Sequence, residues 1–170
     1  MEVPASAHFN YLKEITIELF VKNTGITTFG QNLVWTHDDV WILHYRGGGF
    51  FLKAEDGTTS GYLEWDTTLP TGVWLHITAT WDGAKMRLYV NGEKQTSELN
   101  FDGGSTGRLA APSTVWLGHN FNPAQPWFNG FIASVRIYNR ALTQAEIRHN
   151  MFRWGSPVKD GLVLWLAETS

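Results

Sequence analysis

Residues 73–81 and 86–90 place apolar side chains at every second position, and each run is followed by a turn dipeptide, Asp82-Gly83 or Asn91-Gly92. A period of two residues is typical of a strand with one buried face. Asp-Gly and Asn-Gly tolerate the positive φ angles that tight hairpin turns require. The pattern therefore predicts three consecutive antiparallel strands, a meander, in the middle of the chain.

Most of the remaining chain consists of short apolar or aromatic runs separated by clusters of Gly, Asn, Asp and Pro. Turn signals about 8–12 residues apart favour a β-sandwich over alternating strands and helices. Near the C-terminus, Thr143 and Glu146 form a capping-box pattern, which predicts one short helix at 144–152. The expected strands cover 15–22, 32–36, 40–45, 50–55, 62–66, 73–81, 86–91, 93–96, 115–118, 131–138 and 162–166.

Charge and composition exclude several classes of function. The net charge is −3, so the chain lacks the basic surface that nucleic-acid binding needs. The absence of cysteine excludes disulfides and thiolate metal sites. No apolar run approaches the roughly 20 residues of a membrane-spanning helix, and residues 1–10 show no signal-peptide pattern. We therefore expect neither nucleic acid nor a membrane as a partner.

Several segments resemble laminin G-like domains of the concanavalin A-like lectin and glucanase superfamily. Residues 73–83 and 86–92 resemble the central meander of these domains, and 115–118, 128–132 and 135–147 resemble their final strands and helix. The resemblance implies one all-β domain over residues 1–170, a two-sheet antiparallel jelly-roll sandwich with one short C-terminal helix. It does not imply one function, because this fold carries lectins, enzymes, adhesion modules and structural domains.

The sequence departs from the family pattern in two places. Relatives often carry an acidic pair after the Gly-x-Ile of the last strand, and its first acid can help to hold calcium; this chain has Ala133 and Ser134 there. The residues that would bind a metal are thus unknown. Calcium remains open as a cofactor, since loop carboxylates could supply hard oxygen ligands. The candidate carboxylates are Asp38, Asp39, Asp66 and Asp102.

The second departure concerns residues 160–166, which resemble the opening strand of such domains although they stand at the C-terminus. Either the fold is permuted, or 162–166 begins a following unit. An unpaired strand would leave an exposed sheet edge that needs a partner. We expect 162–166 to pair within this chain, beside the N-terminal strand at 15–22.

The aromatic residues fall into two groups. Those at family core positions, and three others that we also expect in the core, are Trp74, Trp81, Tyr89, Tyr138, Phe20, Phe131 and Trp165. The resemblance leaves five others unexplained. These are Trp35, Trp41, Tyr45, Trp65 and Trp127. An aromatic platform with a few polar groups at its edge is typical of sugar-binding and other small-ligand sites.

The loop 119–129 is the leading candidate for such a site. Pro123 and Pro126 stiffen it, which lowers the cost of holding Trp127 outward beside the amides of Asn120 and Asn122. A second platform is expected on the strand 40–45. The candidate ligand-binding residues are Trp127, Asn120, Asn122, Trp41, Tyr45, Trp65, Asp38, Asp39 and Arg46. The alternative is that these rings are additional core or a protein contact.

The sequence argues against an enzyme. Glucanases of this superfamily carry Glu-x-Asp-x-x-Glu on one strand, and the only near match, Glu64-Trp65-Asp66, has Leu69 in place of the third acid. The leading function is a non-catalytic carbohydrate-binding or adhesion module with a glycan or polysaccharide as partner. The second reading is a structural or decoration module of a virion, cell-surface or extracellular assembly, which would contact other protein subunits. A glucanase-type glycoside hydrolase is the third.

Overall fold

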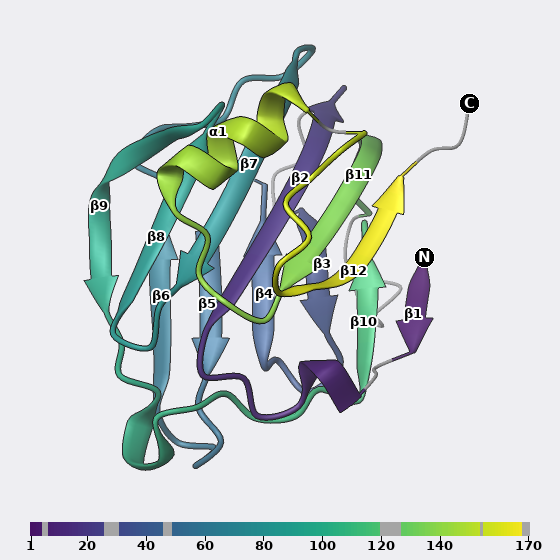
Figure 1. The fold of residues 1–170 in the computed structure, drawn as a ribbon. Helices are drawn as coiled ribbons and strands as arrows, with labels where there is room; N and C mark the ends of the chain where they lie inside the picture. The colour runs from purple at the N-terminus through teal and green to yellow at the C-terminus, as the bar shows by residue number, and fades with distance from the viewer. Residues whose placement is uncertain (5–6, 26–30, 46–48, 120–126, 154, 168–170) are drawn as a thin grey trace.

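The computed structural model describes residues 1–4, 7–25, 31–45, 49–119, 127–153 and 155–167. Two six-stranded sheets face each other (Figure 1). Sheet A has the order β1-β10-β3-β4-β5-β6, and sheet B has the order β12-β11-β2-β7-β8-β9. All neighbouring strands are antiparallel. The predicted two-sheet antiparallel jelly-roll sandwich is therefore confirmed.

The predicted strands are found within a few residues of their expected bounds. Sheet A contains β1 (Glu2–Pro4), β3 (Asn32–Thr36), β4 (Trp41–His44), β5 (Gly49–Lys53), β6 (Ser60–Glu64) and β10 (Thr114–Leu117). Sheet B contains β2 (Ile15–Asn23), β7 (Trp74–Trp81), β8 (Lys85–Val90), β9 (Glu93–Asn100), β11 (Gly130–Tyr138) and β12 (Leu162–Ala167). Two 3-10 turns, η1 (Ala7–Phe9) and η2 (Gly104–Thr106), and the helix α1 (Gln144–Phe152) complete the described elements. Only β1 was not predicted, since three residues are too few to show an alternation.

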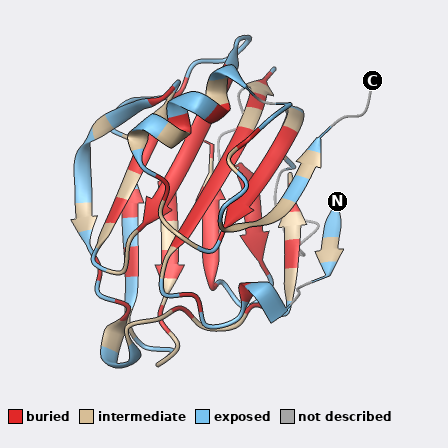
Figure 2. Cartoon of the chain, viewed as in Figure 1, coloured by how far each residue is buried: buried red, intermediate tan, exposed pale blue. Residues whose placement is uncertain are grey.

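The core lies between the two sheets (Figure 2). In β2, Ile15, Ile17, Leu19 and Val21 are fully buried, so one face of the central strand of sheet B points inward. Each buried aliphatic side chain of this size contributes about 1.5–3 kcal/mol relative to exposure. The alternate residues of each strand therefore point to the outer faces of the sandwich.

Helix α1 lies across the outer face of sheet B (Figure 1). Its capping box is formed as predicted: the Thr143 hydroxyl accepts a hydrogen bond from the Glu146 amide, and the Glu146 carboxylate accepts one from the Thr143 amide. Ile147 is buried against Tyr89 and Tyr138 of the sheet. The helix thereby covers the middle of one outer face.

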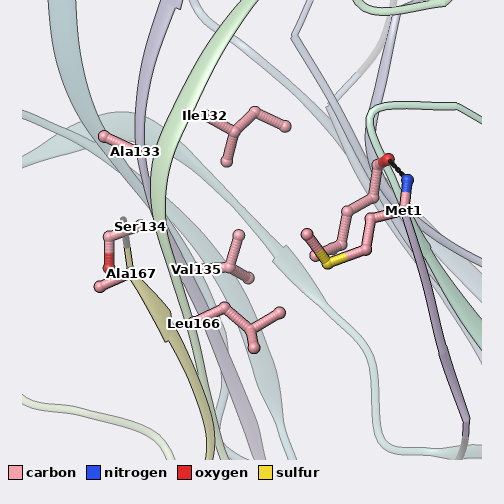
Figure 3. A pocket seen from close by; sticks show the side chains of 8 residues that line it. Met1, Ile132, Ala133, Ser134, Val135, Leu166 and Ala167 are labelled. Atoms are coloured by element: carbon pink, nitrogen blue, oxygen red, sulfur yellow. Dashed lines mark hydrogen bonds between the residues drawn. The ribbon is translucent and has the colours of Figure 1, made fainter. Parts of the chain in front are cut away.

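Strand β12 pairs with β11 in the same chain. The expectation that 162–166 would lie beside 15–22 is wrong in one respect, because β11 lies between β12 and β2. At this edge the sheets leave an apolar groove of about 350 Å³ (Figure 3). Met1 lies on its other wall, where the terminal amine donates a 2.9 Å hydrogen bond to the Leu117 carbonyl oxygen.

Three aromatic residues expected in the core are exposed instead. Trp74 is 49% exposed, Phe131 is 59% exposed and Trp165 is 38% exposed. The reason is strand parity: Leu75 and the residues alternating with it point inward, so the position of Trp74 faces solvent. By contrast, Trp81 is fully buried as predicted.

We predict that Trp81→Ala lowers the free energy of unfolding by about 3–5 kcal/mol. The Trp81 indole packs against Phe101 with ring centroids 5.4 Å apart, and its Nε1 donates a 2.7 Å hydrogen bond to the Phe101 carbonyl oxygen. Its removal leaves both a cavity and an unpaired acceptor. Urea unfolding of the variant measures the loss. Trp74→Ala, on the same strand but exposed, is the matched control and should lose less than about 1 kcal/mol.

Candidate functional site

The turn between β3 and β4 is fixed by hydrogen bonds to the side chain of Thr36. Its hydroxyl oxygen accepts from the amides of Val40 and Trp41 at 2.8 and 3.1 Å. Asp39 adopts a positive φ of 53° in this turn. Its carboxylate accepts a 2.7 Å hydrogen bond from the indole nitrogen of Trp35. The turn therefore brings a carboxylate back to the outer face of sheet A.

Aromatic side chains continue across this outer face onto the neighbouring strand. Trp116 of β10 is the register partner of Trp35 in β3, and paired residues share a face. The His119 ring contacts the Trp116 ring edge-on, with centroids 4.8 Å apart. Trp127 stacks on His119 at 4.5 Å with an interplanar angle of 9°. We call Trp35, Trp116, His119 and Trp127 the tryptophan surface.

The members of the tryptophan surface differ in their access to solvent. Trp127 is 64% exposed, Trp116 and His119 are half-buried, and Trp35 is buried. The indole of Trp127 thus has one face against His119 and most of its remaining area in water. Trp35 forms the floor, and the Asp39 carboxylate lies at its edge.

Three strands of sheet A, β3, β4 and β10, each carry a buried polar atom without a hydrogen-bond partner among the described residues. Asn32 Oδ1, His44 Nδ1 and Trp116 Nε1 are buried, and none has a hydrogen-bond partner within the described residues. Asn32 and His44 are register partners on β3 and β4. Burial lowers the pKa of His44, and the negative charge of Asp39 acts in the opposite direction. Buried polar groups without a partner are rare in folded proteins, so these three atoms are unusual among the described residues.

The predicted loop site is only partly described. Trp127 is exposed as expected, while Asn120, Asn122 and Arg46 lie outside the described residues. Asp38 and Asp39 are exposed in the β3–β4 turn. A hydrogen bond with Ser113 is the main influence that lowers the pKa of Asp38. The structure thus places Asp39 at the tryptophan surface, and the role of these residues in binding stays a prediction.

The predicted second platform is wrong, because Trp41 and Tyr45 point into the core. Both are fully buried. Trp41 meets Phe9 edge-on at 5.9 Å, and Tyr45 packs against Phe128 at 5.6 Å. Both faces of 40–45 are apolar, so its alternation could not show which face was inward. Trp65 is half-buried, and its indole nitrogen donates a 2.9 Å hydrogen bond to the His44 carbonyl oxygen.

Three members of the tryptophan surface are missing from the candidate site of the sequence analysis: Trp35, which it names only as an unexplained aromatic residue, Trp116 and His119. Trp116 alternates with Val115 and Leu117, which are both in the core, so its outward direction was readable from the pattern. The family resemblance identifies residues 115–118 only as a strand and implies no binding role for Trp116. His119 gave no comparable signal, because its contact with Trp127 depends on a loop closure: the Phe128 amide donates a 2.7 Å hydrogen bond to the Gly118 carbonyl oxygen.

Two of the four carboxylates proposed for calcium, Asp66 and Asp102, accept hydrogen bonds from backbone amides. Asp66 accepts from the amides of Thr96 and Ser97 on β9, and Asp102 accepts from the Gly104 amide at 3.0 Å. Among the residues that the structure describes, no three His, Asp or Glu side chains form a group that could hold a metal ion.

The residues of the glucanase-like segment have different surroundings. Glu64 is exposed at the end of β6, Asp66 is held by the β9 amides, and Leu69 is buried.

Comparisons with known proteins agree with this architecture. A family model described as the concanavalin A-like lectin/glucanases superfamily matches residues 1–148. Pappalysin-1 of Mus musculus is 29% identical over 108 residues, which are 60% of this chain and 6% of that protein. The chain therefore spans only a small part of this relative.

Solved structures share the fold at low sequence identity. A proposed carbohydrate-binding protein from Bacteroides ovatus superposes with a TM-score of 0.70 and 19% identity, over 98% of this chain and 48% of that one. Domain 4 of an extracellular arabinanase from Geobacillus stearothermophilus, solved in complex with arabinotriose, gives a TM-score of 0.64 and 24% identity, over 87% and 70% of the two chains. Within the described part of this chain, no helix is long and apolar enough to span a membrane.

We predict that His44 makes the stability of the fold depend on pH. Its pKa is lowered by burial from an ordinary value of about 6.5, so the unfolded chain takes up the proton first as the pH falls. The free energy of unfolding should therefore decline from about pH 6.5 down to the lowered pKa. Urea unfolding of the parent and of His44→Gln between pH 7.5 and 5 tests this. The variant should lose less stability over that range, and equal losses would contradict the prediction.

Proposed function

We propose that this chain, which belongs to the concanavalin A-like lectin/glucanase superfamily, is a non-catalytic carbohydrate-binding module. The observation that carries the proposal is the exposed indole of Trp127, stacked in parallel on His119. A glycan would stack on Trp127 at the outer face of sheet A.

The argument rests on the cost of ordering an aromatic platform. A sugar ring presents a flat face of C–H groups, and an aromatic face complements it. His119 holds Trp127 by stacking and Trp116 supports His119 from the edge. A platform that is already ordered loses little conformational freedom when the ligand binds.

Polar groups beside the rings would fix the orientation of the sugar. The Asp39 carboxylate, held by the Trp35 indole, can accept a hydrogen bond from a ligand hydroxyl. The exposed Asp38 lies in the same turn. A large apolar platform with a few placed polar groups is the usual composition of a small-ligand site.

The similar structures give independent support for a glycan ligand. The arabinanase domain was solved with arabinotriose, and the Bacteroides ovatus protein is considered a carbohydrate binder. Because the arabinanase is extracellular, we also propose an extracellular location for this chain. Adhesion remains part of the proposal, as do any other protein subunits in the same assembly.

The placement of the carboxylates supports a module without catalysis. A retaining or inverting glycosidase needs two carboxyl groups on either side of the scissile bond. The Asp66 carboxylate is already bound to the amides of Thr96 and Ser97. Incubation with β-glucans should release no reducing sugar. Release that disappears in Glu64→Gln would show that the glucanase reading is correct.

We predict that Trp127→Ala abolishes the binding of neutral glycans while the melting temperature changes by less than about 2 °C. The indole is mostly exposed, so its removal costs little stability, whereas about 1 kcal/mol would shift a domain of this size by roughly 2–5 °C. A glycan array identifies the ligand, and calorimetry with the best glycan measures the loss. Phe152→Ala removes another exposed ring, which is 76% exposed at the end of α1, and should bind as the parent does.

The opposite pattern would contradict the proposal. If Trp127→Ala binds every positive glycan normally, the tryptophan surface is not the site. If the variant melts several degrees lower and still binds, Trp127 closes the end of the sandwich and has only a structural role.

A further inference from the structure

We propose a second carbohydrate site on the opposite sheet, selective for a sugar ring that bears a carboxylate. It lies on the outer face of sheet B, around Lys22 of β2. We call it the Lys22 patch, which consists of Lys22, Trp74, Phe131, Thr24 and Asn129. It shares no residue with the tryptophan surface.

The first element of the patch is a pair of exposed rings on either side of a lysine. Lys22 is the register partner of Trp74 on β7 and of Phe131 on β11. Residues paired in this way point to the same face of the sheet. The two rings lie with their centroids 6.4 Å apart and their planes inclined by 43°. Both rings are about half exposed or more, and the half-buried Lys22 comes from the strand between theirs.

The second element is the unsatisfied charge of Lys22. Among the described residues it forms no ion pair and no hydrogen bond through its side chain. Lysine stems pack along apolar surface while the ammonium group stays in water. An anionic group placed above the rings would therefore meet an unpaired cation.

The third element is a polar pair in the next row of the sheet. The Thr24 amide donates a 2.8 Å hydrogen bond to the Asn129 carbonyl oxygen, which places the two residues opposite each other. The Thr24 hydroxyl donates to Asn129 Oδ1 at 3.2 Å. Asn129 Nδ2 has no partner within the described part of the chain, so it can donate to a ligand oxygen.

These elements favour an acidic sugar over the alternatives. A carboxylate can pair with the ammonium group and accept from the amide, while the C–H face of its ring covers the aromatic pair. A neutral sugar would leave the cation unused. An acidic peptide segment would pair with Lys22 but has no flat C–H face for two rings. The patch thus fits a uronic acid residue of an oligosaccharide.

Isothermal titration calorimetry with two trisaccharides tests the proposal. The probes are trigalacturonic acid and the neutral galactose trisaccharide of the same linkage. Lys22→Met keeps the apolar stem and removes the charge, and it should raise the Kd for the acidic probe about 10- to 100-fold. Trp74→Ala should also raise the Kd for the acidic probe. Lys13→Met, which removes an exposed lysine outside the patch, is the matched control and should change nothing.

Three outcomes would overturn the proposal. The first is equal Kd values for the acidic and neutral probes in the parent. The second is loss of acidic binding in Trp127→Ala but not in Lys22→Met, which would place the acidic sugar on the tryptophan surface. The third is a polyglutamate peptide that binds as tightly as trigalacturonic acid and is equally sensitive to Lys22→Met. Because Trp127 and Lys22 are tested separately, failure of this site leaves the proposed function intact, and the reverse also holds.

Discussion

The buried carboxylate of Glu18 helps to hold α1 against sheet B, and the position of α1 determines which part of that sheet is covered. It lies on the outer face of sheet B, yet it is 1% exposed, because Asn150 of α1 contacts it. His76 and Arg136 contact one of its oxygens, and the Asn150 amide of α1 donates a 2.9 Å hydrogen bond to the other. A buried charge that loses its partners costs several kcal/mol. Lifting α1 from the sheet would remove Asn150 from Glu18, so the helix is held to this position by the charge as well as by the apolar contact of Ile147.

This attachment divides the surface of the molecule into covered and uncovered parts. Helix α1 covers part of the outer face of sheet B, whereas the register partners of Lys22, Trp74 and Phe131, remain exposed. Sheet A has no α-helix over its outer face within the described residues. Exposed rings are found in both uncovered parts: Trp127 beside sheet A, and Trp74 and Phe131 on sheet B. The core already contains large aromatic side chains, including Trp41 and Trp81. Rings that stay exposed on the sheets are therefore not needed for the core, and exposed apolar groups of this kind indicate binding surfaces.

The sequence is sufficient to predict the fold, but it predicts only part of the candidate binding surfaces. Alternation and turn dipeptides predicted β7, β8 and β9, and the capping box predicted the start of α1, because these signals act within a few residues. In a strand that is apolar on both faces, such as β4, the sequence does not show which face points to the core. The prediction that Trp41 and Tyr45 face outward is wrong for this reason. The family resemblance misled in the opposite sense by assigning Trp74 to the core although its strand parity points outward. Contacts made across a loop closure, such as that of His119 with Trp127, depend on tertiary geometry that no local pattern encodes.

The two proposed surfaces are joined by one short crossing of the chain, residues 127–131. Trp127 faces sheet A, Phe128 packs between the sheets against Tyr45, and Phe131 faces outward on sheet B. Gly130 makes this crossing possible, because a Cβ there would lie 2.1 Å from the Lys22 carbonyl oxygen and would push the segment off β2. This close approach of Gly130 to β2 holds Phe131 beside Lys22. It also determines where the chain lies at Trp127, four residues before Phe131, and hence where Trp127 meets His119. The position of each ring is therefore determined by the same backbone contact, so the two surfaces share a structural support although they share no binding residue.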